Sequence, residues 1–272
     1  MKSKSALIGY VLVGVFCYLA LTKATSNPQM FFNMHGLGIV IGGLVVAALA
    51  SFPWTVLSGS IRSIYKKVSS GGTIDHETGN ALVRLTSAYQ KNISEFEKEA
   101  ELLPPSFLKE ATNLVLEGLP KETIGEILEK RIEEKRADTS SHVNVMLTLS
   151  KYSPALGLAA TVLGLVDLLS KLSSADMGKL GHGMAIALSA TFYGIIFSNL
   201  VFAPLSEIIS SNGEFEVKEL EMIKDCLAGM LEKENAIVIG EVVNSYLPTA
   251  DRINFVDKLQ TQNKPGNGRM AS

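Results

Sequence analysis

The chain has 272 residues, of which 47% are hydrophobic and 19% are charged, and its formal net charge at pH 7 is −2. Soluble domains usually have about a quarter charged residues, so charge is scarce here, and the balanced sign gives no reason to expect nucleic-acid binding. Cys17 and Cys226 provide no disulfide framework, and the four histidines show no metal-ligand spacing. We therefore expect no metal site, no cofactor and no nucleic-acid partner.

Four apolar stretches approach the length of about 20 residues that a membrane-spanning helix needs. In chain order they cover 6–21, 36–54, about 148–169 and about 183–208. The first is short and follows Lys2 and Lys4, so a signal peptide is an alternative, although its cleavage region is poor. The sequence thus predicts an all-α integral membrane protein with four transmembrane helices.

Basic residues near the ends of the spans indicate the orientation. Lys2 and Lys4 precede the first span, and Arg62, Lys66 and Lys67 follow the second, whereas the opposite loops carry fewer. We expect both termini in the cytoplasm. The expected parts are 1–54 with the first two spans, 55–147 as a helical cytoplasmic insert, 148–210 with the last two spans, and 211–272 as a helical cytoplasmic tail.

Helical periodicity recurs in both cytoplasmic parts, and no strand alternation or solenoid-type repeat is visible. The expected helices cover 80–88, 93–102, 107–116, 123–136 and 215–232. Ser106 is a suitable N-cap for the third, and Gly118 with Pro120 ends it. The polar end of the tail, 260–272, is expected to be disordered. Charge-rich stretches at 91–99 and 126–136 indicate either a solvated helix face or a docking surface for a charged partner.

The third and fourth spans each carry a seam of small and hydroxyl residues. Pro154, Gly157, Thr161 and Gly164 lie within about 60° on one helix face. The corresponding stripe on the fourth span consists of Gly183, Ala187, Ala190, Thr191, Gly194 and Ser198. Such seams allow close helix packing, and their hydroxyl oxygens can line a path for a small ion.

Asp167 lies near the outer end of the third span, four residues before Lys171. One interpretation is an interfacial ion pair between the two side chains. The other is a carboxylate that concentrates cations at the mouth of an ion pathway. The spans contain no nucleophile with a base and no paired carboxylates, so we do not expect an enzyme.

In order and spacing, these features resemble the MotA/PomA family, the membrane subunits of the bacterial flagellar stator. The resemblance covers about 30–260. Its pieces are Ile39-Val40-Ile41-Gly42-Gly43, FLKEATNLVLEG from Phe107, IGEILEKRI from Ile124, SPALGLAATVLGL from Ser153, and AIALSATFYGIIFSNLVFAPL from Ala185. The two strings from the third and fourth spans carry most of the specificity.

The resemblance implies a subunit of the bacterial inner membrane that forms a homo-oligomeric ring, expected to be a pentamer. A MotB/PomB-type partner would supply the ion-binding aspartate, and sodium or proton flow would produce torque on the rotor protein FliG. Two alternatives remain: an ExbB/TolQ-type energiser of outer-membrane processes, and a non-conducting membrane scaffold. ExbB/TolQ proteins usually have three spans and an outward amino end, so the expected orientation favours the stator.

The resemblance also implies roles for the seam residues. Pro154 and Pro204 match the family's prolines at the cytoplasmic ends of the third and fourth spans, where a kinked helix suits a coupling hinge. The ion pathway would include Gly157, Thr161, Ala190, Thr191 and Asp167. Thr161 stands where sodium-type relatives have Thr and proton-type relatives often have Ala, which favours sodium as the coupling ion, with the proton as alternative.

One family motif is altered in this chain. The rotor-facing helix matches at Ala88 and Glu97, but Tyr89 and Gln90 stand where basic residues are expected. We therefore expect the rotor interface to use Lys91, Glu95 and Glu97, with the basic contribution coming from Lys91.

Overall fold

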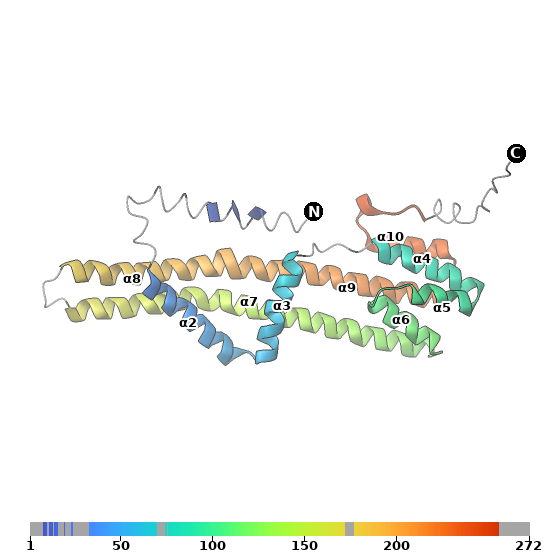
Figure 1. Cartoon of the computed structure of the whole chain (residues 1–272), viewed down its shortest axis with the longest axis horizontal. Helices are drawn as coiled ribbons and strands as arrows, with labels where there is room; N and C mark the ends of the chain where they lie inside the picture. The colour runs from blue at the N-terminus through green and yellow to red at the C-terminus, as the bar shows by residue number, and fades with distance from the viewer. Residues whose placement is uncertain are drawn as a thin grey trace. The chain divides into compact units, whose positions relative to one another are not determined.

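The computed structural model describes residues 33–69, 74, 76–171 and 177–255, with isolated positions between 8 and 23 (Figure 1). In this part of the chain all regular elements are helical, which confirms the all-α prediction. The chain divides into two compact units, Met1–Gly72 with Ala137–Gly213, and Thr73–Arg136 with Glu214–Ser272. Apart from isolated positions, the expected first span and its signal-peptide alternative lie outside the described residues. The same holds for the end that we expect to be disordered, 260–272.

The first unit contains the apolar helices. Among the described residues, three helical stretches are long and apolar enough to cross a membrane: Met34–Ser51, Lys121–Ser170 and Gly183–Leu231. They contain the expected third and fourth spans and most of the second, whose expected end at 54 lies beyond the helix that ends at Ser51. Helix α2 (Met34–Ser51) begins at Asn33, whose side chain accepts hydrogen bonds from the amides of His35 and Gly36, and it ends before Pro53 because a residue preceding proline avoids the helical conformation.

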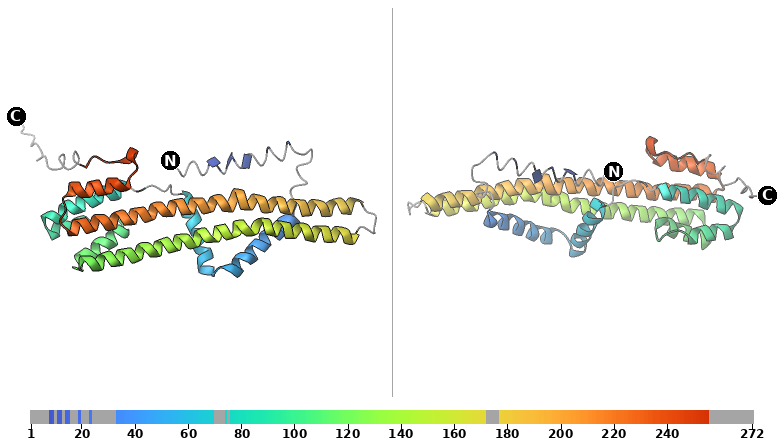
Figure 2. Two further views of the ribbon diagram at one scale, coloured as in Figure 1. Left: turned by 180° about the vertical axis from the view of Figure 1, so that it is seen from behind. Right: turned by 45° about the horizontal axis from the view of Figure 1, so that its top comes forward.

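Helix α7 (Lys121–Lys171) is one continuous helix through Pro154. The sequence patterns predict two helices here, 123–136 and about 148–169, but residues 137–147 contain no glycine or proline to interrupt them. Helix α8 (Met177–Ile196) leads through a π-helical turn, η3 (Phe197–Phe202), into α9 (Ala203–Leu231). Figure 2 shows α7 and α8 side by side in both views.

The second unit has one hydrophobic core. It combines α4 (His76–Lys91), α5 (Ile93–Glu101), α6 (Phe107–Leu116) and α10 (Ala236–Tyr246) with parts of α7 and α9, and the short η4 (Thr249–Asp251) follows α10. The expected helices 80–88, 93–102 and 107–116 are confirmed, as are the Ser106 cap and the left-handed Gly118 with φ of 75°. Cys226 lies in this core and is 1% exposed.

The sequence patterns predict neither α10 nor α3 (Trp54–Ser69). Helix α3 follows α2 directly in the first unit, with Pro53 between them (Figure 1). Its outward face carries Trp54, Ile61 and Tyr65, which are 71%, 68% and 80% exposed. Aromatic residues beside a spanning helix are typical of the membrane–water interface.

Candidate ion pathway and coupling residues

The seams of α7 and α8 face each other at backbone distance. A Cβ atom on Gly157 would lie 2.9 Å from the carbonyl oxygen of Ala190, and one on Gly194 would lie 2.5 Å from the carbonyl oxygen of Ser153. A Cβ atom on Gly164 would lie 2.7 Å from that of Ala187. Any side chain at these glycines would separate the two helices, so the small residues are needed for the close approach.

This approach brings Thr161 and Thr191 together in a cluster of oxygen atoms. Thr161 Oγ1 lies 3.0 Å from the carbonyl oxygens of both Gly157 and Ala187, and it contacts Thr191 Oγ1. Thr191 Oγ1 lies 3.3 Å from the carbonyl oxygen of Gly157. Each of the two hydroxyl groups has one proton to donate, so not every one of these oxygen–oxygen contacts can be a hydrogen bond. Converging neutral oxygens are the kind of ligand that a small hard cation accepts.

Two other predicted pathway residues differ in their placement. Ala190 is fully buried at the helix contact, next to Thr191. Asp167 has an exposed side chain two turns beyond Thr161, and its backbone carbonyl accepts a hydrogen bond from Ser170 Oγ at 2.7 Å. The side chain of Lys171 lies outside the described residues, so the expected pair with Asp167 is not defined. Among the described residues, no group of three or more His, Cys, Asp or Glu is placed to hold a metal ion.

The two prolines lie at special points of their helices. Pro154 is inside α7, where its missing N–H leaves the carbonyl of Ser150 without its helical donor. Pro204 lies two residues after the end of the π-helical turn η3. At that end, the amide of Ala203 donates to the carbonyl of Ser198, five residues back. Such turns are often found at functional sites.

Ser150 and Ser198 connect the two weakened helix regions. Ser150 Oγ lies 3.2 Å from the carbonyl oxygen of Ser198 and 3.1 Å from Ser198 Oγ. The sequence pattern places Ser198 on the fourth-span stripe but does not single out Ser150. The available signal for Ser150 is its position four residues before Pro154, because its carbonyl loses its helical donor there.

The expected rotor residues lie at the α4–α5 corner of the second unit. Lys91 Nζ is 3.5 Å from Glu95 Oε2, and Glu97 is exposed on α5. Tyr89 packs edge-on against Phe96 with ring centroids 5.3 Å apart, and Gln90 Nε2 donates to the carbonyl oxygen of Glu234 at 2.5 Å. The residues that replace the family's basic positions therefore stabilise this unit itself.

The second charge-rich stretch, 126–136, forms ion pairs within the same unit. The pairs are Glu129–Lys224 at 2.6 Å, Arg136–Glu221 at 2.7 Å, Arg131–Glu110 at 2.8 Å and Lys135–Glu216 at 3.0 Å, and Lys121 contacts Glu232 nearby. The hydrogen bond and the positive charge of Lys224 lower the pKa of Glu129, and the hydrogen bond to Glu129 raises the pKa of Lys224. Much of this stretch thus holds α7 to α9 and α6.

Comparison with known proteins finds a match to one family model within the chain. The family model described as the MotA/TolQ/ExbB proton channel family matches residues 99–222. Residues 99–222 of the chain are therefore similar to this family. The matched range includes Pro154, Thr161, Thr191 and Pro204, so the hydroxyl cluster and both prolines lie inside it.

Curated relatives are similar to the chain over nearly its whole length. Motility protein A of Bacillus subtilis is 24% identical over 263 residues, which cover 96% of each chain. Chemotaxis protein PomA of Vibrio alginolyticus is 24% identical over 248 residues, covering 91% of this chain and 97% of PomA.

Two solved structures share the fold. A chain of the C. jejuni MotAB structure has a TM-score of 0.84 at 22% identity and covers 92% of this chain and 98% of its own length. A chain of the flagellar MotAB stator complex from Bacillus subtilis has a TM-score of 0.81 at 23% identity and covers 93% and 99%.

Proposed function

We propose that the chain is the ring-forming subunit of a flagellar stator in the bacterial inner membrane. With a MotB/PomB-type partner it converts ion flow into torque on the rotor protein FliG. Full-length similarity to two proteins named for motility and chemotaxis supports this function over an ExbB/TolQ-type role. The proposal includes four spans, a cytoplasmic insert and tail, and both termini in the cytoplasm.

The observation that carries the proposal is the oxygen cluster between α7 and α8. Thr161, Thr191 and the carbonyls of Gly157 and Ala187 offer neutral oxygen ligands in the seam of two apolar helices. A neutral ligand set suits a pathway in which the partner's aspartate supplies the charge, because a second fixed carboxylate in the membrane is costly. Oxygen ligands that replace water favour sodium as the coupling ion.

Coupling follows from the position of the prolines relative to this cluster. Pro154 lies seven residues before Thr161 on α7, and Pro204 follows the π-helical turn that continues α8. A change in ion occupancy alters the packing of α7 against α8 at the cluster. The helices bend most easily where a backbone hydrogen bond is missing. The change in packing therefore bends the helices at the two prolines.

A complementation experiment tests the function. The chain is produced together with a MotB/PomB-type partner in a motile bacterium that lacks its own stators. We expect swimming and rotation of tethered cells to return only when both proteins are present. Restored outer-membrane uptake without rotation would instead support the ExbB/TolQ-type role, and restoration of neither activity by an inserted, assembled complex would support a scaffold.

A further inference from the structure

The inner face of α3 is polar where it meets α7. Ser60 and Lys67 are 1% and 5% exposed, although they lie on the helix whose opposite face carries Trp54, Ile61 and Tyr65. Buried polar groups usually have specific partners, because an unpaired one costs free energy.

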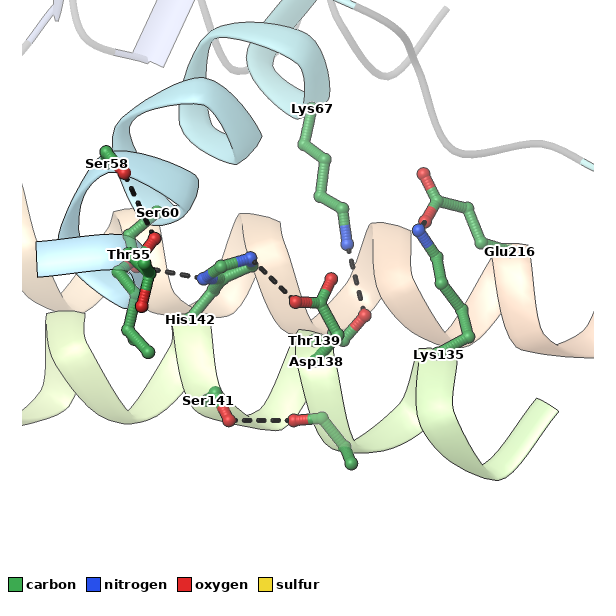
Figure 3. Close-up of polar contacts among 12 residues, drawn as sticks. Thr55, Ser58, Ser60, Lys67, Lys135, Asp138, Thr139, Ser141, His142 and Glu216 are labelled. Atoms are coloured by element: carbon green, nitrogen blue, oxygen red, sulfur yellow. Dashed lines mark hydrogen bonds and ion pairs between the residues drawn. The ribbon is translucent and has the colours of Figure 1, made fainter. Parts of the chain in front are cut away.

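His142 of α7 is the partner of Ser60 (Figure 3). Its ring is buried, with Nδ1 2.9 Å from Ser60 Oγ and Nε2 3.2 Å from Asp138 Oδ1. Ser60 Oγ also donates to the carbonyl oxygen of Val56 at 2.8 Å. These contacts form a continuous series from Asp138 through His142 and Ser60 to the backbone of α3.

The chain also provides the space for this ring. A Cβ atom on Gly59 would lie 2.9 Å from His142 Cε1, so only a glycine lets the imidazole lie this close to α3. The contact is therefore built from both helices: α3 provides Gly59 and Ser60, and α7 provides His142 and Asp138.

The C-terminal end of α3 has a second set of polar contacts. Lys67 Nζ lies 3.5 Å from Thr139 Oγ1 of α7 (Figure 3), and Asn212 Nδ2 of α9 donates to the backbone carbonyl of Lys67 at 2.7 Å. Apolar packing accompanies both sets: Ile64, between them, and Leu57, just before Gly59, pack against the cluster of Val145, Met146 and Ile209. Polar contacts have stricter geometry than apolar ones, so they fix the position of α3 along α7.

We propose that His142 is a positioning residue that fixes the interfacial helix α3 against α7 on the cytoplasmic side of Pro154. The motor role of this link depends on the proposed function. In that function, a bend of α7 at Pro154 moves the part of α7 that carries His142, and α3 sets the position of this part at the membrane surface. The link itself does not depend on that function.

Hydrogen exchange of the amides of 54–69 in the full chain, assembled with its partner in lipid nanodiscs, tests the link. His142→Phe keeps a flat ring without its nitrogens, and we expect exchange of α3 to rise about fivefold, as for the loss of one buried hydrogen bond. Ser60→Ala should have a similar effect. Because both changes break one contact, the double variant should be no worse than either single variant.

Two serines provide matched controls. Ser58 on α3 and Ser141 on α7 are exposed, and their hydroxyls bind carbonyls of their own helices (Figure 3). Ser58→Ala and Ser141→Ala should leave the exchange of α3 unchanged. His142→Gln retains an amide that donates and accepts, so it should restore most of the protection that His142→Phe loses.

Additive effects of Ser60→Ala and His142→Phe, or equal effects of the controls, would overturn the link. If His142→Phe does not assemble, Ser60→Ala and Gly59→Ala test the same link. The Gly59→Ala change displaces the imidazole ring, so either variant should raise the exchange of α3. Rotation at high load is measured in parallel: it should fall in His142→Phe and recover in His142→Gln. Loosened α3 with full rotation would remove the motor role but keep the link, whereas failure of the wild-type chain to drive rotation concerns only the proposed function.

Discussion

Thr161 and Thr191 share the carbonyl oxygen of Gly157 although they lie on different helices. Each hydroxyl therefore contributes both to the helix contact and to the set of oxygens around it. The contribution to helix packing is small, because interhelical hydrogen bonds in membranes average about 0.6 kcal/mol. The two roles can be separated by replacing threonine with valine, which has nearly the same shape.

We expect Thr161→Val and Thr191→Val to leave the complex assembled but to reduce rotation about tenfold or more at low sodium, because an ion ligand is lost. Thr161→Ser and Thr191→Ser keep the oxygen and should retain most of the speed. Speed is measured on tethered cells over a sodium series at fixed pH. Undiminished wild-type rotation with potassium in place of sodium would exclude sodium as the coupling ion.

Asp167 allows a prediction about ion access. A carboxylate at the outer end of the span raises the local cation concentration, an effect that salt screens. Asp167→Asn should lower speed about two- to threefold at low coupling-ion concentration and have little effect at saturation. Asp167→Glu, which keeps the charge, is the matched control. Equal loss at all ion concentrations would indicate a packing defect instead.

At the scale of helices, the π-helical turn η3 and the two prolines mark where the long helices are least supported by backbone hydrogen bonds. The Ser150–Ser198 contact joins these regions of α7 and η3. A bend in one of these helices therefore changes the position of the other.

Pro154→Ala and Pro204→Ala should restore the missing hydrogen bonds and stiffen the helices. We expect both variants to insert and assemble, with a loss of at least about tenfold in torque because the bend is suppressed. Membrane fractionation and pull-down of the partner measure assembly, and bead rotation under load measures torque. Full-speed rotation by either variant would remove that proline from the hinge.

The ion pairs between α7 and α9 allow a charge-swap prediction. Glu129→Lys and Lys224→Glu should each destabilise the second unit by roughly 0.3–1 kcal/mol, because the pair is half exposed, and the double swap should recover part of the loss. Hydrogen exchange of 121–136 and 214–231 in the full chain measures the effect. Single changes without effect would show that the pair does not contribute to stability.

The pKa shifts give the pH dependence of this pair. The lowered pKa of Glu129 means that its stabilisation is present at neutral pH and is lost as the pH falls through that lowered value. The raised pKa of Lys224 means that its stabilisation is lost only as the pH rises through that raised value. The second unit should therefore open more readily in acid. This acid dependence should be weaker in either single variant and should return in the double swap if the new pair forms.

Local sequence signals were sufficient for α6 and much of α5, whose caps Ser106 and Asn92 precede periodic apolar residues. Helix α3 was not predictable in this way because Gly59 and its several serines lower helix propensity, and its stability comes from packing on α7. The contact between Ser60 and His142 joins residues 82 positions apart, and no local pattern pairs them. By contrast, the threonine cluster followed from helical spacing, because both seams consist of small residues.

At the scale of the whole molecule, the proposed function requires contact with a rotor, and the α4–α5 corner is the expected surface. Tyr89 and Gln90 are used for internal contacts, so the exposed charges there include those of Lys91 and Glu97, and Glu95 is half-exposed beside Lys91. Charge complementarity at such an exposed surface acts mainly on encounter and orientation, and it weakens with salt.

Glu97→Lys should therefore reduce rotor engagement about threefold or more at low salt, and a matching reversal on the rotor protein should restore part of it. Lys91→Glu is the companion change, and a triple reversal of Glu95, Glu97 and Glu99 allows for redundancy. Glu241→Lys on α10 is the control with the same change in net charge. Stator number per motor, counted by fluorescence, measures engagement, and no effect of the triple variant would indicate a merely solvated face.

Cys226 has a practical consequence for studying these movements. Burial, with a smaller contribution from the charge of Asp225, raises the pKa of its thiol to about 12. Since the thiolate is the reactive form, the Cys226 thiol should not react with maleimides or disulfide reagents at neutral pH. A cysteine introduced on the exposed surface of α5 or α10 can then carry a fluorophore or spin label without competing signal from Cys226.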